Sequence, residues 1–168
     1  MSGTQQPAAV RLCFVCWGNI CRSPAAEAIM RRLVDEAGLA DRITVDSAGT
    51  SNEHLGEAPD SSTIKEARRR GLDVEGHRVW RFETKDFDRF DLVLVVDRVN
   101  ERRLLAQADT HDAAAKVKLL RSFVADDLYD AEIPDPWYGG DKDFILAFDL
   151  AEEACLAVLE HVRCHLLS

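Results

Sequence analysis

The stretch VRLCFVCWGNICRSP, residues 10–24, passes from a short apolar run through a turn to the start of a helix. Val10–Cys16 is mostly apolar and is followed by Gly18-Asn19, which predicts a buried strand that ends in a tight turn. Ser23-Pro24 predicts a helix start, because proline is tolerated in the first turn of a helix. A strand that leads directly into a helix is the usual first unit of a parallel sheet covered by helices.

The remainder of the chain continues this alternation. Five apolar residues in a row at 92–96 are typical of a central parallel strand covered on both faces. Further strands are predicted at 43–45, 77–80 and 117–120, and loops at 47–59 and 125–141. Helices are predicted at 23–38, 60–70, 84–90 and 100–108. The last helix carries an apolar stripe at steps of three and four: Phe144, Phe148, Ala151, Cys155, Leu159 and Val162.

These elements predict an α/β fold of three layers, with a parallel sheet between two helical layers. A chain of 168 residues suits one domain. The polar segment 1–9 is expected to be flexible, and residues 10–168 are expected to form the single domain. Ligands of such sheets bind beyond the carboxyl ends of the strands, where the turn after Cys16 lies.

Composition excludes several classes of protein. The formal net charge is -9, so general nucleic-acid binding, which needs a basic face, is not expected. The run Arg68-Arg69-Arg70 is interpreted as a solvated helix end. The apolar run at 12–17 is too short for a signal peptide or a membrane span, which favours a cytoplasmic protein that does not bind membranes. Its five cysteines are then expected to be reduced thiols.

The turn itself carries chemistry. Cys16 ends the strand, and Arg22 lies six positions later at the helix start. The intervening backbone N–H groups can point inward and form a nest for an anion, with Gly18-Asn19 suited to positive φ. Donors that hold a phosphate also stabilise a thiolate, so Cys16 is expected to be nucleophilic near neutral pH. Arg22 offers a planar fork for two phosphoryl oxygens, and Ser23 can hydrogen-bond the sulfur as it leaves.

At these residues the sequence resembles the low-molecular-weight protein tyrosine phosphatases. Val15–Pro24 matches the family motif throughout, and nearly the whole chain after Ala9 follows the family pattern. Further matches lie at 46–50, 76–78, 96–97 and 135–139. The resemblance implies a four-stranded parallel twisted sheet flanked by helices. It also implies hydrolysis of phosphotyrosine through a phosphocysteine on Cys16, with phosphotyrosine-containing proteins as partners and no cofactor.

The resemblance extends to further site residues. Asp135 takes the position of the general acid that protonates the leaving phenolate, and the same carboxylate would then activate water. A network that braces the loop is implied at Asn19, Ser23, Ser47 and His77, and Asp97 matches another acid near the site. Contacts to the substrate are expected from Trp17, Gly18, Asn19, Ile20, Cys21, Ser23, Trp137 and Tyr138.

Cys21 matches a second loop cysteine, which in relatives forms a reversible disulfide with the nucleophile. A reactive thiolate beside a second thiol is the expected arrangement of a redox sensor. The alternative is that Cys21 is simply a packed thiol. Nothing in the scheme needs a metal ion, because Arg22 and the loop amides supply the charge stabilisation. The protein is expected to be a monomer.

The pocket walls depart from the family pattern. Trp17 replaces a smaller residue, Trp137-Tyr138 replaces a tyrosine pair, and 51–54 carries no aromatic residue where many relatives place Trp or Tyr. We expect Trp17 and Trp137 to supply the missing wall for a phenyl ring. Phosphoarginine phosphatases of the same superfamily usually carry Thr at the position of Ile20, so Ile20 favours the tyrosine class.

Other interpretations remain. Arsenate reductases of the same fold share the Cys and Arg loop but need two more cysteines downstream, and this chain has none between Cys21 and Cys155. A phosphate-binding module without activity would be expected to lack Cys16, Arg22 or Asp135. A zinc site at Cys13, Cys16 and Cys21 fits known ligand spacings poorly. Taken singly, Asp135 could be a turn residue before proline and His77 a structural histidine.

Overall fold

The computed structural model describes residues 9–124 and 131–167. Most of the predicted N-terminal segment 1–9 and part of the predicted loop 125–141 therefore lie outside the described residues. Within the described ranges, no helix combines the length and the apolar character that crossing a membrane requires.

Four parallel strands form one sheet: β1 (Val10–Cys16), β2 (Ile43–Gly49), β3 (Leu92–Val95) and β4 (Val117–Leu119). Their order across the sheet is β2-β1-β3-β4, so β1 lies between β2 and β3. The loop that follows β1 therefore leaves the sheet at the centre of its carboxyl edge. The predicted three-layer fold with a four-stranded parallel sheet is confirmed.

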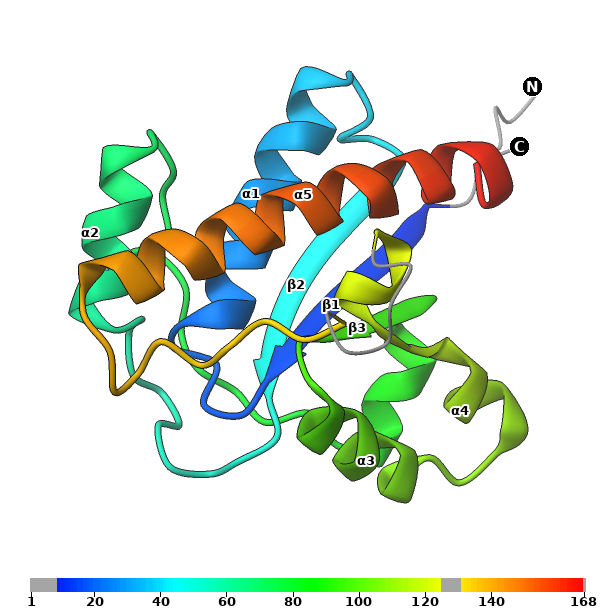
Figure 1. The fold of residues 1–168 in the computed structure, drawn as a ribbon. Helices are drawn as coiled ribbons and strands as arrows, with labels where there is room; N and C mark the ends of the chain where they lie inside the picture. Colours follow the sequence, from blue (N-terminus) through cyan, green and yellow to red (C-terminus); the bar gives the residue numbers. More distant parts are fainter. Residues whose placement is uncertain (1–8, 125–130, 168) are drawn as a thin grey trace.

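Helices cover both faces of the sheet (Figure 1). One face packs against α1 (Arg22–Glu36) and the long α5 (Asp141–His165), which crosses the sheet, with α2 (Ser61–Arg69) beside them. The other face packs against the 3-10 helix η1 (Thr84–Arg89), α3 (Arg98–Gln107) and α4 (His111–Lys116). A second 3-10 helix, η2 (Leu120–Phe123), follows β4.

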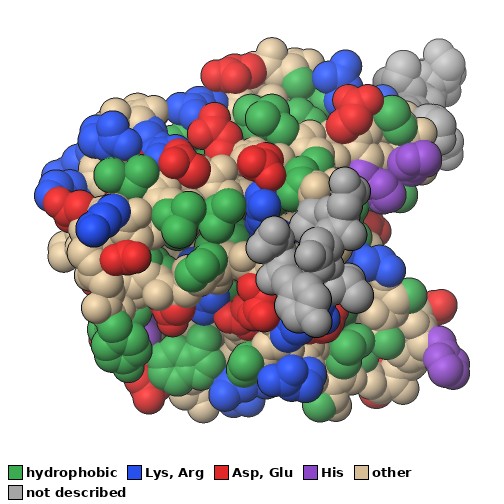
Figure 2. All heavy atoms as spheres, viewed as in Figure 1, with side chains coloured by type: hydrophobic (Ala, Val, Ile, Leu, Met, Phe, Trp, Pro, Cys, Tyr) green, Lys and Arg blue, Asp and Glu red, His purple; other side chains and the backbone are tan. Residues whose placement is uncertain are grey.

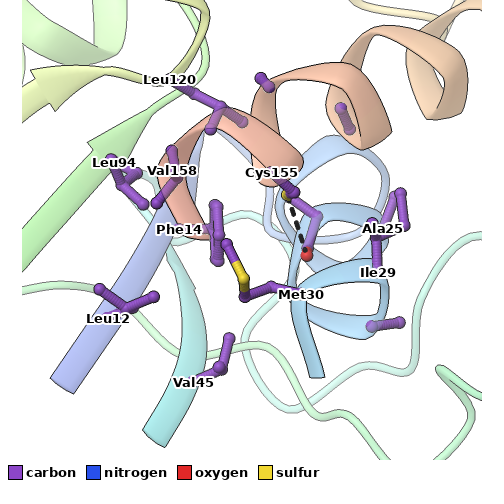
Figure 3. Packing of buried hydrophobic residues seen from close by; sticks show 14 of the residues in the cluster. Leu12, Phe14, Ala25, Ile29, Met30, Val45, Leu94, Leu120, Cys155 and Val158 are labelled. Carbon is purple, nitrogen blue, oxygen red and sulfur yellow. Dashed lines mark hydrogen bonds between the residues drawn. The ribbon is translucent and has the colours of Figure 1, made fainter. Parts of the chain in front are cut away.

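Alternate side chains of β1 enter the two layers of the core, because successive residues of a strand point to opposite faces. Phe14 is fully buried on the α1 and α5 side, close to Met30 and Val158 (Figure 3). Cys13 and Val15 are fully buried on the opposite side. A run of apolar residues with no polar alternation is therefore what this central strand requires. All six residues of the predicted α5 stripe are buried.

The basic run 68–70 at the end of α2 lies among acidic side chains. Arg69 and Arg70 both donate to Glu66, and Arg70 also reaches Asp149 of α5 at 2.7 Å. Figure 2 shows Lys and Arg side chains interleaved with Asp and Glu over the part of this face formed by α2 and α5. The run is thus an ion-paired junction between two helices, and only Arg70 departs from the predicted solvated position because its side chain is mostly buried.

Two predicted elements differ from the structure. The predicted strand at 77–80 is wrong: only the next residue, Arg81, forms an isolated parallel bridge, to Gly49. The chain there crosses the edge of β2 instead of joining the sheet along its length. The strand predicted at 43–45 continues to Gly49, so the loop predicted from residue 47 begins later.

Helix boundaries differ where a polar side chain caps the helix. Asp97 accepts a hydrogen bond from Asn100 N and so starts α3 at Arg98, two residues before the predicted start. The 3-10 helix η1 begins after Glu83, whose backbone N–H donates to the Asp86 carboxylate at 2.7 Å. The short helix α4, which Thr110 caps by accepting from Ala113 N, was not predicted from the sequence.

Candidate active site

Cys16 is the last residue of β1 and Arg22 the first residue of α1, so one short loop connects the two (Figure 1). Both residues are buried. The loop lies beyond the sheet's carboxyl edge, where parallel sheets bind ligands. It forms one side of a cavity of about 390 Å³, lined by Cys16, Trp17, Gly18, Ile20, Cys21, Arg22, Glu53, His54, Asp135, Trp137 and Tyr138.

The Cys16 sulfur has two polar neighbours, one in the loop and one in the first turn of α1. Asn19 N donates to Sγ at 3.2 Å, and Ser23 Oγ lies 3.0 Å from it. Asn19 turns its amide inward through a left-handed backbone, with φ 57°. The N-cap of α1, Cys21, makes no side-chain cap bond, so the amides of the first turn remain available to an anion.

Positive φ was expected for Gly18 as well as Asn19, and for Gly18 the expectation is wrong. Gly18 is instead constrained by space, since a Cβ there would lie 3.3 Å from His54 Cδ2. Gly49, at the end of β2, is constrained more strongly, because a Cβ would lie 2.9 Å from the carbonyl oxygen of Trp17. The close approach of the β2 end to the loop therefore needs a glycine at position 49.

A network centred on Asn19 joins the loop to its surroundings. Its side-chain amide donates to Ser23 Oγ at 2.8 Å and to Ser47 Oγ at 3.1 Å. Its Oδ1 lies 2.8 Å from His77 Nε2 and also accepts from Trp80 N. Burial lowers the pKa of His77, so a neutral ring that donates from Nε2 to Asn19 fits the site. The structure thus brings together all four residues expected to brace the loop.

Arg22 is held by two groups that lie far along the chain. Its Nη1 donates to Asp97 Oδ2 at 2.7 Å and to the carbonyl oxygen of Ile133 at 2.9 Å. Its Nη2 lies 3.6 Å from Asp135 Oδ2. Burial lowers the pKa of Arg22, but the negative charges of Cys16, Asp97 and Asp135 together raise it above the ordinary arginine value. The guanidinium is therefore a fixed cation beside the cysteine.

Asp135 lies at the rim of the cavity. Its side chain is about half exposed, at 47%. One oxygen, Oδ1, accepts from Trp137 N at 3.1 Å, and the other faces Arg22. This carboxylate is accessible to solvent and near both the guanidinium and the cavity, which is the position that proton exchange with a bound group requires.

The outer walls of the cavity are aromatic. Trp17 and Trp137 both line it, as expected, and Tyr138 stands at the mouth with 94% of its surface exposed. His54 also lines the cavity, although it was not predicted from the sequence, and it packs against Trp137 with the ring centroids 5.6 Å apart. His54 Nδ1 lies 2.6 Å from Glu57 Oε2, which fixes the orientation of the ring. No periodic pattern marks this histidine; only its place after β2 could have drawn attention to it.

Cys21 is buried next to the cavity. Burial raises the pKa of its thiol well above the ordinary value. Cys21 is therefore a protonated thiol near neutral pH. All five cysteines are free thiols in this structure.

The idea of a zinc site at the loop cysteines has no geometric support. Cys13 lies in the core cluster on the face of the sheet opposite to that of Cys16. In the part of the chain that the structure describes, no group of three His, Cys, Asp or Glu residues could hold a metal ion.

Comparison of the chain with known proteins identifies its family. The family model described as low molecular weight phosphotyrosine protein phosphatase matches residues 11–166. The chain belongs to this family. A low molecular weight protein-tyrosine-phosphatase of Streptomyces coelicolor is 42% identical over 156 residues, covering 91% of this chain and 93% of the relative. Membership of the low molecular weight phosphatases makes the protein a hydrolase.

Solved structures of the family extend the similarity to three dimensions. A protein tyrosine phosphatase from Entamoeba histolytica superposes with a TM-score of 0.87 at 34% identity, covering 92% of this chain and 97% of that one. A Drosophila arginine phosphatase superposes with a TM-score of 0.84 at 32% identity, covering 90% and 97%. The fold of the low molecular weight phosphatases therefore accompanies more than one named activity.

Proposed function

We propose that this low molecular weight phosphatase hydrolyses phosphotyrosine through a phosphocysteine on Cys16, with Arg22 as the phosphate-binding cation and Asp135 as general acid and base. One observation supports this most strongly: the Cys16 sulfur lies against Asn19 N and Ser23 Oγ, on the cavity that Arg22 and Asp135 also line. Donors that stabilise a thiolate and a cation that binds phosphate thus share one pocket.

In the first step the thiolate attacks phosphorus. A sulfur–phosphorus bond forms as the bond between phosphorus and the phenolic oxygen breaks, and Asp135 gives its proton to the departing phenolate. Arg22 is held through Nη1 by Asp97 and Ile133, and we propose that Nη2, which lies 3.6 Å from Asp135 Oδ2, binds the phosphoryl oxygens together with Nε. The guanidinium and the loop amides stabilise the charge that these oxygens carry in the transition state.

In the second step water attacks the phosphocysteine. Asp135, now a carboxylate, takes a proton from the water, and the bond between sulfur and phosphorus breaks. The sulfur leaves as a thiolate, which the Ser23 hydroxyl and the Asn19 amide can stabilise at 3.0 and 3.2 Å. Inorganic phosphate is the product, and the enzyme returns to its starting state.

The walls favour an aromatic phosphate ester. Trp17 and Trp137 offer flat apolar surface beside the loop, and aromatic pairs stabilise a bound ring beyond simple burial. Tyr138 at the mouth is exposed enough to contact the segment that carries the phosphotyrosine. Gly18, Ile20 and Cys21 also line the cavity and are further proposed contacts to the substrate. Proteins that contain phosphotyrosine are the proposed partners.

Phosphoarginine is the second candidate substrate. The similarity to the Drosophila arginine phosphatase favours it, whereas the apolar Ile20 that lines the cavity favours the tyrosine class. Arsenate reduction has less support: Cys155 is fully buried against α1, where its thiol donates to the Ala26 carbonyl (Figure 3), and so cannot relay a disulfide from the loop without unfolding of the core.

The test compares phosphotyrosine, phosphoserine and phosphoarginine peptides, with Cys16→Ser as the control for the nucleophile. We expect hydrolysis of phosphotyrosine alone, no turnover by the variant, and no effect of EDTA. Faster hydrolysis of phosphoarginine than of phosphotyrosine would make phosphoarginine the substrate. Turnover by Cys16→Ser or inactivation by EDTA would contradict the mechanism.

We further propose that Cys21 protects Cys16 as a reversible disulfide partner and that the protein acts as a cytoplasmic monomer.

A further inference from the structure

A second network of hydrogen-bonded side chains, which we call the relay, lies on the α3 side of the loop, away from the Asn19 network. The relay runs from Arg22 through Asp97 and Asn100 to Thr50. Asp97 Oδ2 accepts from Arg22 Nη1 at 2.7 Å, and Asp97 Oδ1 accepts from Asn100 Nδ2 at 2.8 Å. Asn100 Oδ1 accepts from Thr50 Oγ1 at 2.7 Å.

The backbone of Thr50 connects the relay to the beginning of the loop. Thr50 N donates to the carbonyl oxygens of Cys16 and Trp17 at 3.0 and 3.1 Å. Thr50 directly follows Gly49, which lies close to the Trp17 carbonyl. The two ends of the phosphate-binding loop, Cys16 and Arg22, are thus joined twice: once by the loop itself and once by Thr50, Asn100 and Asp97.

Each member of this relay is fixed by its surroundings. Asn100 is 1% exposed and Thr50 6% exposed, so neither can exchange its partner for water. Asn100 has its amide nitrogen on the Asp97 carboxylate and its amide oxygen on the Thr50 hydroxyl, which leaves one orientation of the amide. Asp97 is itself held at the start of α3 by Asn100 N at 2.9 Å. Buried polar groups with single possible partners rigidify what they connect.

We infer that Thr50 and Asn100 are positioning residues for phosphoryl transfer, which hold the Arg22 guanidinium through Asp97 at a fixed place relative to the Cys16 sulfur. The inference rests on the proposed function, in which sulfur and guanidinium must engage the same phosphoryl group. A small displacement of one relative to the other lowers the rate steeply, because transition-state stabilisation depends on preorganised geometry.

Thr50→Val removes the hydroxyl but keeps the shape of the side chain and the backbone N–H that binds Cys16 and Trp17. It leaves Asn100 Oδ1 buried without a donor, which allows the amide and Asp97 to shift. We expect kcat/KM for p-nitrophenyl phosphate to fall about 10-fold, within the range that an unpaired buried polar group allows. Thr50→Ser retains the hydroxyl and is expected to restore most of the rate.

A second measurement, the protection of Cys16 by phosphate, does not depend on turnover. Inorganic phosphate protects Cys16 from alkylation by iodoacetate if Arg22 and the loop amides bind it. The relay predicts that Thr50→Val requires about 5- to 10-fold more phosphate for half protection, and that Thr50→Ser resembles the wild type. Failure of the wild type to hydrolyse any phosphate ester would refute the proposed function, whereas the protection assay would still report on the relay.

The matched control is Thr110→Val, which removes the hydroxyl that caps α4 away from the loop. It should lower the melting temperature without changing kcat/KM or phosphate protection. In a double-mutant cycle, Thr50→Val combined with Asn100→Ala should be no slower than Asn100→Ala alone, because the two act through one path. Three results would each overturn the inference. The first is a Thr50→Val variant with the kcat/KM and phosphate protection of the wild type. The others are additive losses of kcat/KM in the double variant, and losses in Thr110→Val that equal those in Thr50→Val.

Discussion

Glu27 of α1 links the pH to the stability of the fold behind the active-site loop. Its side chain is only 13% exposed. Burial raises its pKa from 4.5 to about 7, the negative charge of Asp46 adds to the rise, and Arg31 together with hydrogen bonds from Ser47 opposes it. Ser47 in turn accepts from Asn19, so the carboxyl belongs to the surroundings of the loop.

The sign of the effect follows from linkage. A carboxyl whose pKa is higher in the folded state than in the unfolded chain holds its proton more tightly when folded. The stability it contributes is fully present below pH 4.5 and is lost as the pH rises through about 7. The interval between these two pKa values corresponds to at most about 3.5 kcal/mol, at about 1.4 kcal/mol for each pKa unit. The pH window is therefore 4.5 to 7.

Glu27→Gln removes the titration and keeps the size of the side chain. We expect its unfolding free energy to exceed that of the wild type by an amount that grows by about 2 to 3 kcal/mol between pH 5 and pH 8. For a chain of this length the gain in melting temperature at pH 8 should then exceed the gain at pH 5 by roughly 4 to 12 °C, at about 2 to 4 °C for each kcal/mol. Urea unfolding at a series of pH values measures the free energies directly.

The control is Glu36→Gln on the same helix, an exposed carboxylate beside Arg32. Its difference from the wild type should stay within about 0.5 kcal/mol at every pH, as is usual for exposed ion pairs. A Glu27→Gln variant whose advantage is the same at pH 5 and pH 8 would refute the reasoning, because burial of the ionised carboxyl would then have no measurable cost.

Three further predictions concern the site. Asp135→Asn should slow phenyl phosphate more than p-nitrophenyl phosphate, because the poorer leaving group needs the proton more; equal losses for both esters would remove Asp135 from the role of general acid. Trp17→Ala should raise KM for a phosphotyrosine peptide several-fold through loss of the aromatic wall, and unchanged kinetics would exclude Trp17 from substrate binding. Peroxide should inactivate the enzyme reversibly through a bond between Cys16 and Cys21, with recovery in dithiothreitol; in Cys21→Ser the loss should become permanent, and full recovery of that variant would contradict a protective role.

Those parts of the fold that depend on local pattern were predictable from the sequence. The apolar run Val10–Cys16 and the stripe of α5 are buried as expected, because a central strand and a covering helix must be apolar wherever they pack. The order of residues in the loop also identified Cys16 and Arg22, since a thiol, a turn and a guanidinium at this spacing are neighbours along the chain.

Other features depend on residues that meet only after folding. Thr50 and Asn100 are 50 positions apart, and neither is unusual in its own segment. His54 reaches the cavity because the chain after β2 folds back over Gly18, which no periodicity shows. The predicted strand at 77–80 failed for the same reason: Val79 packs against Ile20 and Cys21 of the loop, Trp80 packs on the opposite core cluster, and neither pairs along a neighbouring strand.

The central claim is that phosphorus is transferred to Cys16 during turnover. Rapid acid quenching of the enzyme with p-nitrophenyl phosphate, followed by mass spectrometry of the peptide that contains residues 10–24, tests it most directly. We predict one added phosphoryl group on Cys16 in the wild type within the first turnover and none in Cys16→Ser. Steady turnover with no phosphoryl group on this peptide, or with the group on another residue, would contradict the account.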